Sequence, residues 1–147
     1  MPASSAEIAI VQELWREYWA SFGLTDDFQG FGAELAALPG KYQRLLIEYV
    51  EGNPAGTVSL RPVNKTACEV KRLYVRPAFR GQGLARTLME RIIAEARALG
   101  YTRMYADTLP QMTQALAMYR RMGFIETSPY SEDPTPGAIF LELPLLI

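Results

Sequence analysis

Four stretches of the chain repeat apolar side chains with the period of a helix. In the first, Ser4 and Glu7 have the spacing of a capping box, and Gly23 ends the pattern. The third is the most regular, with charged residues on its opposite side and Gly100 as a plausible C-cap. The pattern therefore predicts helices over residues 4–23, 28–38, 83–99 and 108–123.

Between these stretches lie short runs rich in β-branched, aromatic and leucine residues, which is typical of strands. The runs at 43–50, 55–63 and 67–75 are joined by short turns, so they predict an antiparallel meander. A further strand at 101–108 follows the long helix, and this crossover requires a parallel neighbour. Another strand begins at 124–125, and the last runs over 138–143 after a polar loop at 128–136.

Together these elements predict one α/β (α+β) domain over residues 1–147, with a mixed, mostly antiparallel twisted sheet flanked by about four helices. No repeat or linker divides the chain. The terminal Leu145-Leu146-Ile147 is apolar enough to pack at an interface, so a homodimer is one expectation.

Composition narrows the possible chemistry. The net charge of −1 argues against a nucleic-acid partner. The chain has no histidine and one cysteine, Cys68, which leaves no histidine base, no internal disulfide and no cysteine cluster for a metal. No signal peptide or membrane span is visible, so we expect a cytoplasmic protein without a metal or a membrane partner.

The stretch Arg80-Gly81-Gln82-Gly83-Leu84-Ala85-Arg86 connects a strand to the longest helix. Its small residues let backbone N–H groups converge at the helix N-terminus, which favours a phosphate or pyrophosphate. A simple glycine turn is the alternative. A dinucleotide fingerprint fails because its third glycine position holds Arg86, and no Gly-Lys-Ser/Thr triplet exists for a triphosphate loop.

The pattern RxxGxA, formed here by Arg80, Gly83 and Ala85 after Val75, resembles the coenzyme A pyrophosphate loop of the GNAT acetyltransferase superfamily. Further along, Ala115, Met118, Tyr119, Gly123 and Phe124 are similar to that family's AxxLYxxxGF signature. The resemblance is strong from about Cys68 to Phe124. It implies the GNAT fold, with a splayed parallel strand pair at the centre of the sheet.

Two departures from the family pattern stand out. Met112 occupies a position where many members have an asparagine, so a polar contact to the pantetheine arm is in doubt. The family's usual first strand is short or missing, because the first predicted helix begins within a few residues of Met1.

The resemblance implies acetyl-CoA as co-substrate and a primary amine as acceptor, with small amines, polyamines, amino acids, antibiotics and protein termini all open. It implies that the coenzyme is held by residues at the end of the third strand, in the loop and in the fourth helix: Leu73, Tyr74, Val75, Arg80, Gly81, Gln82, Gly83, Leu84, Ala85, Arg86, Met112 and Ala115.

The resemblance also implies two catalytic candidates. Tyr119 is expected to protonate the departing thiolate, unless its hydroxyl is satisfied by a backbone carbonyl. Glu69 is expected to act as general base, directly or through water; alternatively it is a surface carboxylate paired with Lys71 or Arg72. In a regular strand, Glu69, Lys71, Leu73 and Val75 would share one face, although a bulge would break this alternation.

Other functions are also open. A coenzyme A-binding sensor or interaction module would keep the pocket without turnover, and a nucleotide-binding oxidoreductase would need a repeated parallel unit. Cys68 is conceivable as an acyl-carrying nucleophile, but the chain has no histidine to activate it. Among the aromatics of the first two helices, Trp19, Phe22, Phe28 and Phe31 are weak acceptor-pocket candidates that the helical spacing places mainly in the core.

Overall fold

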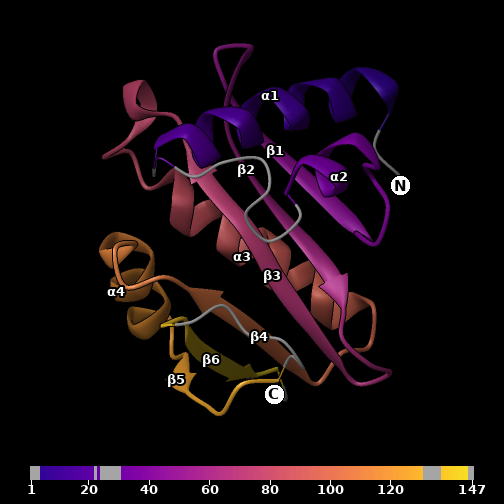
Figure 1. The fold of residues 1–147 in the computed structure, drawn as a ribbon, viewed down its shortest axis with the longest axis vertical. Coiled ribbons are helices and arrows are strands. Elements are labelled where there is room, and N and C mark those ends of the chain that lie inside the picture. Colours follow the sequence, from indigo (N-terminus) through magenta and orange to yellow (C-terminus); the bar gives the residue numbers. More distant parts are fainter. Residues whose placement is uncertain (1–3, 22, 24–30, 131–136, 146–147) are drawn as a thin grey trace.

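The computed structural model describes residues 4–21, 23, 31–130 and 137–145. It is built around a six-stranded sheet with the order β1-β2-β3-β4-β6-β5 (Figure 1). The strands are β1 (Arg44–Val50), β2 (Asn53–Pro62), β3 (Ala67–Val75), β4 (Arg103–Thr108), β5 (Ile125–Glu126) and β6 (Ile139–Pro144). All neighbouring strands are antiparallel except β3 and β4. The predicted mixed sheet with one parallel pair is confirmed.

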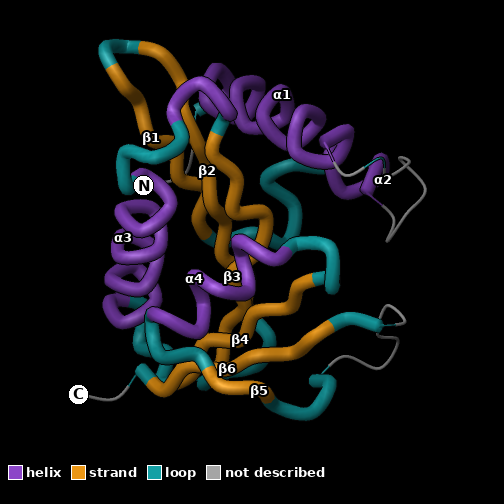
Figure 2. Tube along the Cα trace, turned by 90° about the vertical axis from the view of Figure 1, so that its left-hand side faces the viewer, coloured by secondary structure: helices purple, strands orange, loops and turns teal. Residues whose placement is uncertain are grey.

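Helices cover both faces of this sheet (Figures 1 and 2). On one face lie α1 (Ser5–Ser21) and α2 (Phe31–Ala36), and on the other lie α3 (Leu84–Ala98) and α4 (Thr113–Arg121). Each pair has its own apolar cluster: Trp15, Trp19 and Phe31 belong to the first, and Leu88 and Ile92 to the second. Two layers of helix around a sheet bury both of its faces, as the apolar patterning requires.

The parallel pair β3–β4 separates before either strand ends. Its register runs from Ala67 opposite Arg103 to Val70 opposite Ala106, although β3 continues to Val75 and β4 to Thr108. The unpaired ends diverge beside α4 and α1, which opens a gap in the middle of the sheet (Figure 1). The splayed pair that the family resemblance implied is therefore present.

A β-bulge in β3 changes which side chains face which helices. Tyr74 lies opposite Thr57 and Lys71 opposite Ser59, so β3 has one residue more than β2 in this interval. Arg72 is in the bulge, with φ at +59°. As a result Leu73 and Val75 pack on the α3 side, whereas Arg72 lies against Trp19 of α1. Glu69, Lys71, Leu73 and Val75 therefore do not share one face, because the bulge that the sequence analysis left open shifts the alternation by one residue.

The structure corrects one predicted helix boundary, confirms one predicted helix cap and places one residue that was expected at an interface. The fourth helix begins at Thr113 rather than near Pro110, because Met112 has a non-helical ψ of 58° and serves as N-cap. The capping box at the start of α1 is confirmed: the Ser4 N–H donates to Glu7 and the Glu7 N–H to the Ser4 hydroxyl. Leu145 is buried in the α3-side core instead of at an interface, while 146 and 147 lie outside the described residues.

Within the described ranges, no helix has both the length and the apolar character needed to cross a membrane.

Candidate active site

The loop before α3 has the geometry of an anion site. Gly81 and Gly83 have φ values of +81° and +77°, which glycine adopts without strain. Backbone N–H groups from Gly81 to Arg86 donate to no acceptor in the part of the chain that the structure describes. They lie at the start of a 15-residue helix, whose dipole adds positive potential at its N-terminus. The loop thus offers free donors for a pyrophosphate.

The arginines at the two ends of this loop are exposed. Arg80 donates from Nε to the Val75 carbonyl at 3.0 Å, which ties the loop to the end of β3. Arg86 lies 3.9 Å from Glu90 one turn along α3. Neither guanidinium is buried in a strong ion pair, so both add positive charge that an anionic ligand can still reach.

A cavity of about 40 Å³ lies where β3 and β4 separate. That volume accommodates a few water-sized groups. Residues from α1, the bulge of β3, the end of β4 and α4 line the cavity: Tyr18, Trp19, Lys71, Arg72, Leu73, Asp107, Thr108, Leu109, Met112, Ala115 and Tyr119.

Tyr119 lies in the wall of this cavity and is only 4% exposed. Its ring contacts Phe124 at a centroid distance of 5.2 Å, while its hydroxyl has no hydrogen-bond partner among the described residues. The backbone-carbonyl partner considered from the sequence is thus not seen in that part of the chain. Burial raises the pKa of Tyr119, with the neighbouring Tyr18 and Asp107 acting in the same direction. The hydroxyl is therefore protonated at neutral pH and free to donate.

The helix that carries Tyr119 places two more predicted residues in the cavity, Met112 and Ala115. Met112 caps the helix without a side-chain cap bond, and its sulfur accepts a hydrogen bond from the Tyr18 hydroxyl at 3.5 Å. Where the family pattern has an asparagine, this chain therefore links α4 to α1 through a thioether.

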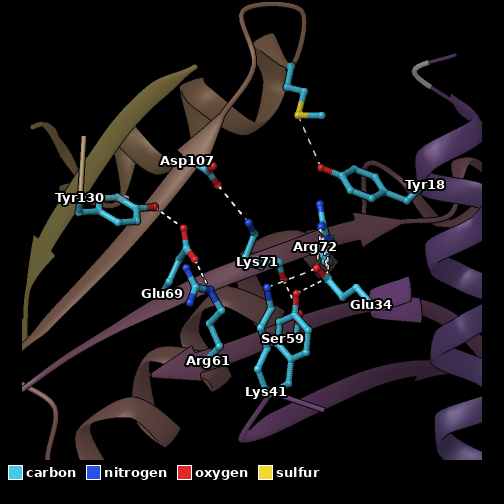
Figure 3. A network of polar contacts seen from close by, with 12 residues as sticks. Tyr18, Glu34, Lys41, Ser59, Arg61, Glu69, Lys71, Arg72, Asp107 and Tyr130 are labelled. Atoms are coloured by element: carbon cyan, nitrogen blue, oxygen red, sulfur yellow. Dashed lines mark hydrogen bonds and ion pairs between the residues drawn. The ribbon is translucent and has the colours of Figure 1, made fainter. Parts of the chain in front are cut away.

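Glu69 is almost completely buried, with 1% exposed, and does not line the cavity. Arg61 donates to one carboxylate oxygen at 2.5 Å and the Tyr130 hydroxyl donates to the other (Figure 3). The alternative interpretation, a surface glutamate paired with Lys71 or Arg72, is wrong on both exposure and partners. Instead the carboxylate joins β2 and β3 to the segment that precedes β6.

A second closed ion pair involves the bulge residue. Arg72 donates three hydrogen bonds to Glu34 at 3.1–3.3 Å, and its guanidinium carbon lies 4.5 Å from the Trp19 ring centroid. Burial acts to raise the pKa of Glu34, but Arg72 and the Tyr42 hydroxyl outweigh it and hold the pKa below its usual value. Trp19 and Phe31 stack beneath this pair at 4.3 Å. These two aromatics are core residues, although Trp19 also reaches the cavity; Phe22 and Phe28 lie outside the described residues.

Lys71 and Asp107 are functional candidates that sequence reasoning missed. Lys71 Nζ lies 3.9 Å from Asp107 Oδ1, and both side chains line the cavity (Figure 3). The sequence contained one usable signal: Asp107 is a carboxylate near the end of a predicted strand, beside the splay that the family resemblance implied. No local sequence feature predicts that Lys71 lines the cavity, because the β-bulge sets the direction of the neighbouring side chains.

An anion-site loop, a splayed parallel strand pair and a cavity lined by a buried tyrosine therefore occur together in this domain. The sequence profile of the Acetyltransferase (GNAT) family matches residues 9–124. An uncharacterized N-acetyltransferase of Schizosaccharomyces pombe is 36% identical over 136 residues, which cover 88% of this chain and 83% of the relative. An uncharacterized N-acetyltransferase of Escherichia coli is 32% identical over 120 residues, covering 74% and 71%. The chain belongs to the GNAT acetyltransferase family.

Solved structures agree on the fold. A GNAT-family acetyltransferase from Staphylococcus aureus Mu50 superposes with a TM-score of 0.84 at 17% identity, covering 99% of this chain and 98% of that one. A Salmonella typhimurium protein solved with its cofactor acetyl-CoA gives a TM-score of 0.71 at 23% identity, covering 100% and 93%. The family and fold inferred from the sequence are thus confirmed, and the oxidoreductase alternative is excluded.

Proposed function

We propose that this protein is an acetyl-CoA-dependent N-acyltransferase that moves an acetyl group to a primary amine by direct attack. The observation that carries this proposal is the opening between β3 and β4: it holds a cavity with an unpartnered hydroxyl, and the loop with free N–H groups follows the same strand β3. A coenzyme A sensor without turnover has no need of that hydroxyl. Support also comes from the N-acetyltransferase relatives and from the neighbour that binds acetyl-CoA.

The residues that would hold acetyl-CoA fit a pyrophosphate and a pantetheine arm. Backbone N–H groups of Gly81, Gln82, Gly83, Leu84, Ala85 and Arg86 would bind the pyrophosphate, with Arg80 beside them. The diverging end of β3, from Leu73 through Tyr74 to Val75, has lost β4 as a neighbour and would pair with the arm as an added strand does. Met112 and Ala115 would contact the arm from the other side. When bound, acetyl-CoA supplies an activated acetyl group as a thioester.

Tyr119 then has a defined task. The amine nitrogen bonds to the acetyl carbon as the carbon–sulfur bond breaks, and the Tyr119 hydroxyl donates a proton to the departing sulfur. The raised pKa keeps this proton in place until sulfur develops charge. Its burial in a small cavity also strengthens the hydrogen bond, because little water competes for the donor.

The acceptor must lose one proton before it attacks, and Glu69 of β3 and Asp107 of β4 are the two carboxylates considered for this step. Glu69, the base that the family resemblance implies, would have to release Tyr130 or Arg61 before it could accept a proton. Asp107 lines the cavity and needs no such rearrangement. The geometry therefore favours Asp107 as the base, and Glu69 then positions Arg61 and Tyr130. Separate substitutions of Asp107 and Glu69 distinguish these two roles.

The test is a thiol-release assay with acetyl-CoA and a panel of primary amines, with mass spectrometry of the products. We expect acetylation of at least one amine and saturable acetyl-CoA binding by calorimetry. Acetyl-CoA binding without turnover of any amine would support the sensor instead.

A further inference from the structure

The charged groups around the cavity are of two kinds. Arg72 and Glu34 share three hydrogen bonds, and Glu69 is engaged by Arg61 and Tyr130, so these groups have fixed partners inside the fold. The pair Lys71–Asp107 is different. Its charged atoms are 3.9 Å apart, and neither side chain makes a hydrogen bond within the described part of the chain.

This pair is nevertheless largely shielded from water. The side chain of Lys71 is 13% exposed and that of Asp107 is 20% exposed. An ammonium carries three donors and a carboxylate accepts at two oxygens, so most of their hydrogen-bonding capacity is not used by the described part of the fold. Charges with little exposure are normally paired and hydrogen-bonded, and this open pair can still accept a ligand that completes it.

Two opposite charges on one cavity wall match a ligand that carries both. Resting on the proposed function, we propose that the acceptor is an α-amino acid or a close analogue, bound as a zwitterion across Lys71 and Asp107. Its carboxylate would accept hydrogen bonds from Lys71 while its ammonium donates to Asp107. One carbon separates the two groups of such a ligand, so it can bridge side chains whose charged atoms lie 3.9 Å apart.

The same arrangement orients the reacting atom. Asp107 and Tyr119 line one cavity, so an ammonium bound at Asp107 is held beside the hydroxyl proposed to serve the departing sulfur. Asp107 takes one proton from the ammonium and passes it to solvent, and the free amine attacks. The new carbon–nitrogen bond replaces the carbon–sulfur bond, a second nitrogen proton is lost after attack, and the thiolate receives the proton of Tyr119, which is later restored. One proton is released in total.

The pair itself disfavours a purely cationic acceptor. A polyamine would pair with Asp107 and add a further positive charge beside Lys71, whereas an acceptor with a carboxylate gives each member of the pair a partner. A protein N-terminus would use Asp107 and leave Lys71 without a role.

Matched acceptors test this proposal directly. Each standard amino acid is compared with its own carboxamide, which keeps the side chain and amine but lacks the carboxylate. We expect the best amino acid to exceed its carboxamide in kcat/KM by about 10- to 100-fold, the usual range for a hydrogen bond to a charged group. The amine of the carboxamide is less basic than that of the amino acid, so a larger fraction of it is unprotonated. A preference for the amino acid therefore cannot arise from a higher concentration of free amine.

Substitution of Lys71 supplies the second arm. Lys71→Met should raise KM for the amino acid until the preference over the carboxamide falls within about threefold, because the carboxamide has no carboxylate for that cation to bind. Lys71→Arg should retain part of the preference, since it keeps the cation. Lys65→Met is the matched control, because Lys65 is exposed in the turn between β2 and β3.

The outcomes separate the two proposals. Equal turnover of acids and carboxamides, turnover only of amines without a carboxylate, or an unchanged preference in Lys71→Met would overturn the zwitterion site and leave the acetyltransferase intact. No turnover of any amine would overturn the proposed function, and the zwitterion site with it.

Discussion

The two proposed binding regions, one for acetyl-CoA and one for the acceptor, consist of different chemical groups. The proposed donor side is a loop of backbone N–H groups held open by Gly81 and Gly83, and it is exposed. The proposed acceptor side is a set of side chains from separate elements that includes Lys71, Asp107 and Tyr119. A backbone site would recognise the pyrophosphate of the proposed co-substrate. A side-chain site can change its ligand by substitution without disturbing the loop.

Within the acceptor side, closed and open ion pairs have separate uses. Arg72–Glu34 fixes the bulge against α1 and α2 with several hydrogen bonds, whereas Lys71–Asp107 has none within the described residues. The closed pair should therefore govern stability, and the open pair should govern turnover. This distinction would be wrong if substitution of Arg72 mainly lowered turnover and substitution of Lys71 mainly lowered stability.

The largest effect is expected on proton removal. Asp107→Asn should lower kcat/KM by roughly 10²–10⁴-fold near neutral pH, with partial recovery at high pH where free amine is abundant. Glu69→Gln should cost less in rate, because that carboxylate faces Arg61 and Tyr130 rather than the cavity. Steady-state kinetics over a pH series measures both. A greater loss for Glu69→Gln than for Asp107→Asn would assign the base to Glu69.

The free energy of unfolding should depend more on the Arg72–Glu34 pair than on the Lys71–Asp107 pair. Arg72→Met leaves the Glu34 carboxylate without its main partner, and loss of one member of a buried pair costs about 3–5 kcal/mol. Lys71→Met should cost less than about 1 kcal/mol, because its pair is loose. Urea unfolding of the two variants gives the comparison, and equal losses would show that both pairs are structural.

The stability effect also has a predicted pH dependence. Folding holds the pKa of Glu34 below its ordinary value of 4.5, so its contribution is present above that pH. It is lost as the pH falls through the lowered pKa and the carboxylate becomes protonated. The stability difference between wild type and Arg72→Met should therefore shrink in acid, and a constant difference from pH 7 to pH 3 would assign the loss to packing alone.

On the donor side, Gln82→Glu adds one negative charge among the free N–H groups without changing side-chain size. We expect acetyl-CoA affinity to fall about 10- to 100-fold by calorimetry, since the charge opposes the pyrophosphate at close range. This substitution avoids Gly83, where any side chain would be strained at φ +77°. Ala94→Glu makes the same charge change on the exposed side of α3 and should bind normally. Equal affinities in all three proteins would remove the loop from the site.

The sequence reveals the donor side because its geometry is local. Glycines that need positive φ, a following helix and a preceding strand are consecutive in the chain, so the loop could be predicted from the residues alone. The antiparallel meander β1-β2-β3 and a parallel neighbour for β4 followed from turn lengths and the crossover helix, whereas the places of β5 and β6 in the sheet were not predicted.

The acceptor side depends on tertiary structure, and there prediction was incomplete. One inserted residue at Arg72 reversed the alternation of β3, and hydrophobic periodicity carries no record of such a bulge. The partners of Glu69 come from positions 61 and 130, far away along the chain, so its pairing could not be read from neighbours. Tyr119 was accessible to prediction because a signature resembling the family's surrounds it.

The most direct test of the account is the kcat of Tyr119→Phe. This substitution keeps the ring and its contact with Phe124 and removes only the hydroxyl, which has no partner among the described residues. The account predicts a near-native Tm, unchanged acetyl-CoA affinity and a kcat lowered at least tenfold, as expected when an interaction made only in the transition state is lost. A wild-type kcat would contradict the proposed role of Tyr119, and a large loss of stability would assign the hydroxyl to the fold instead.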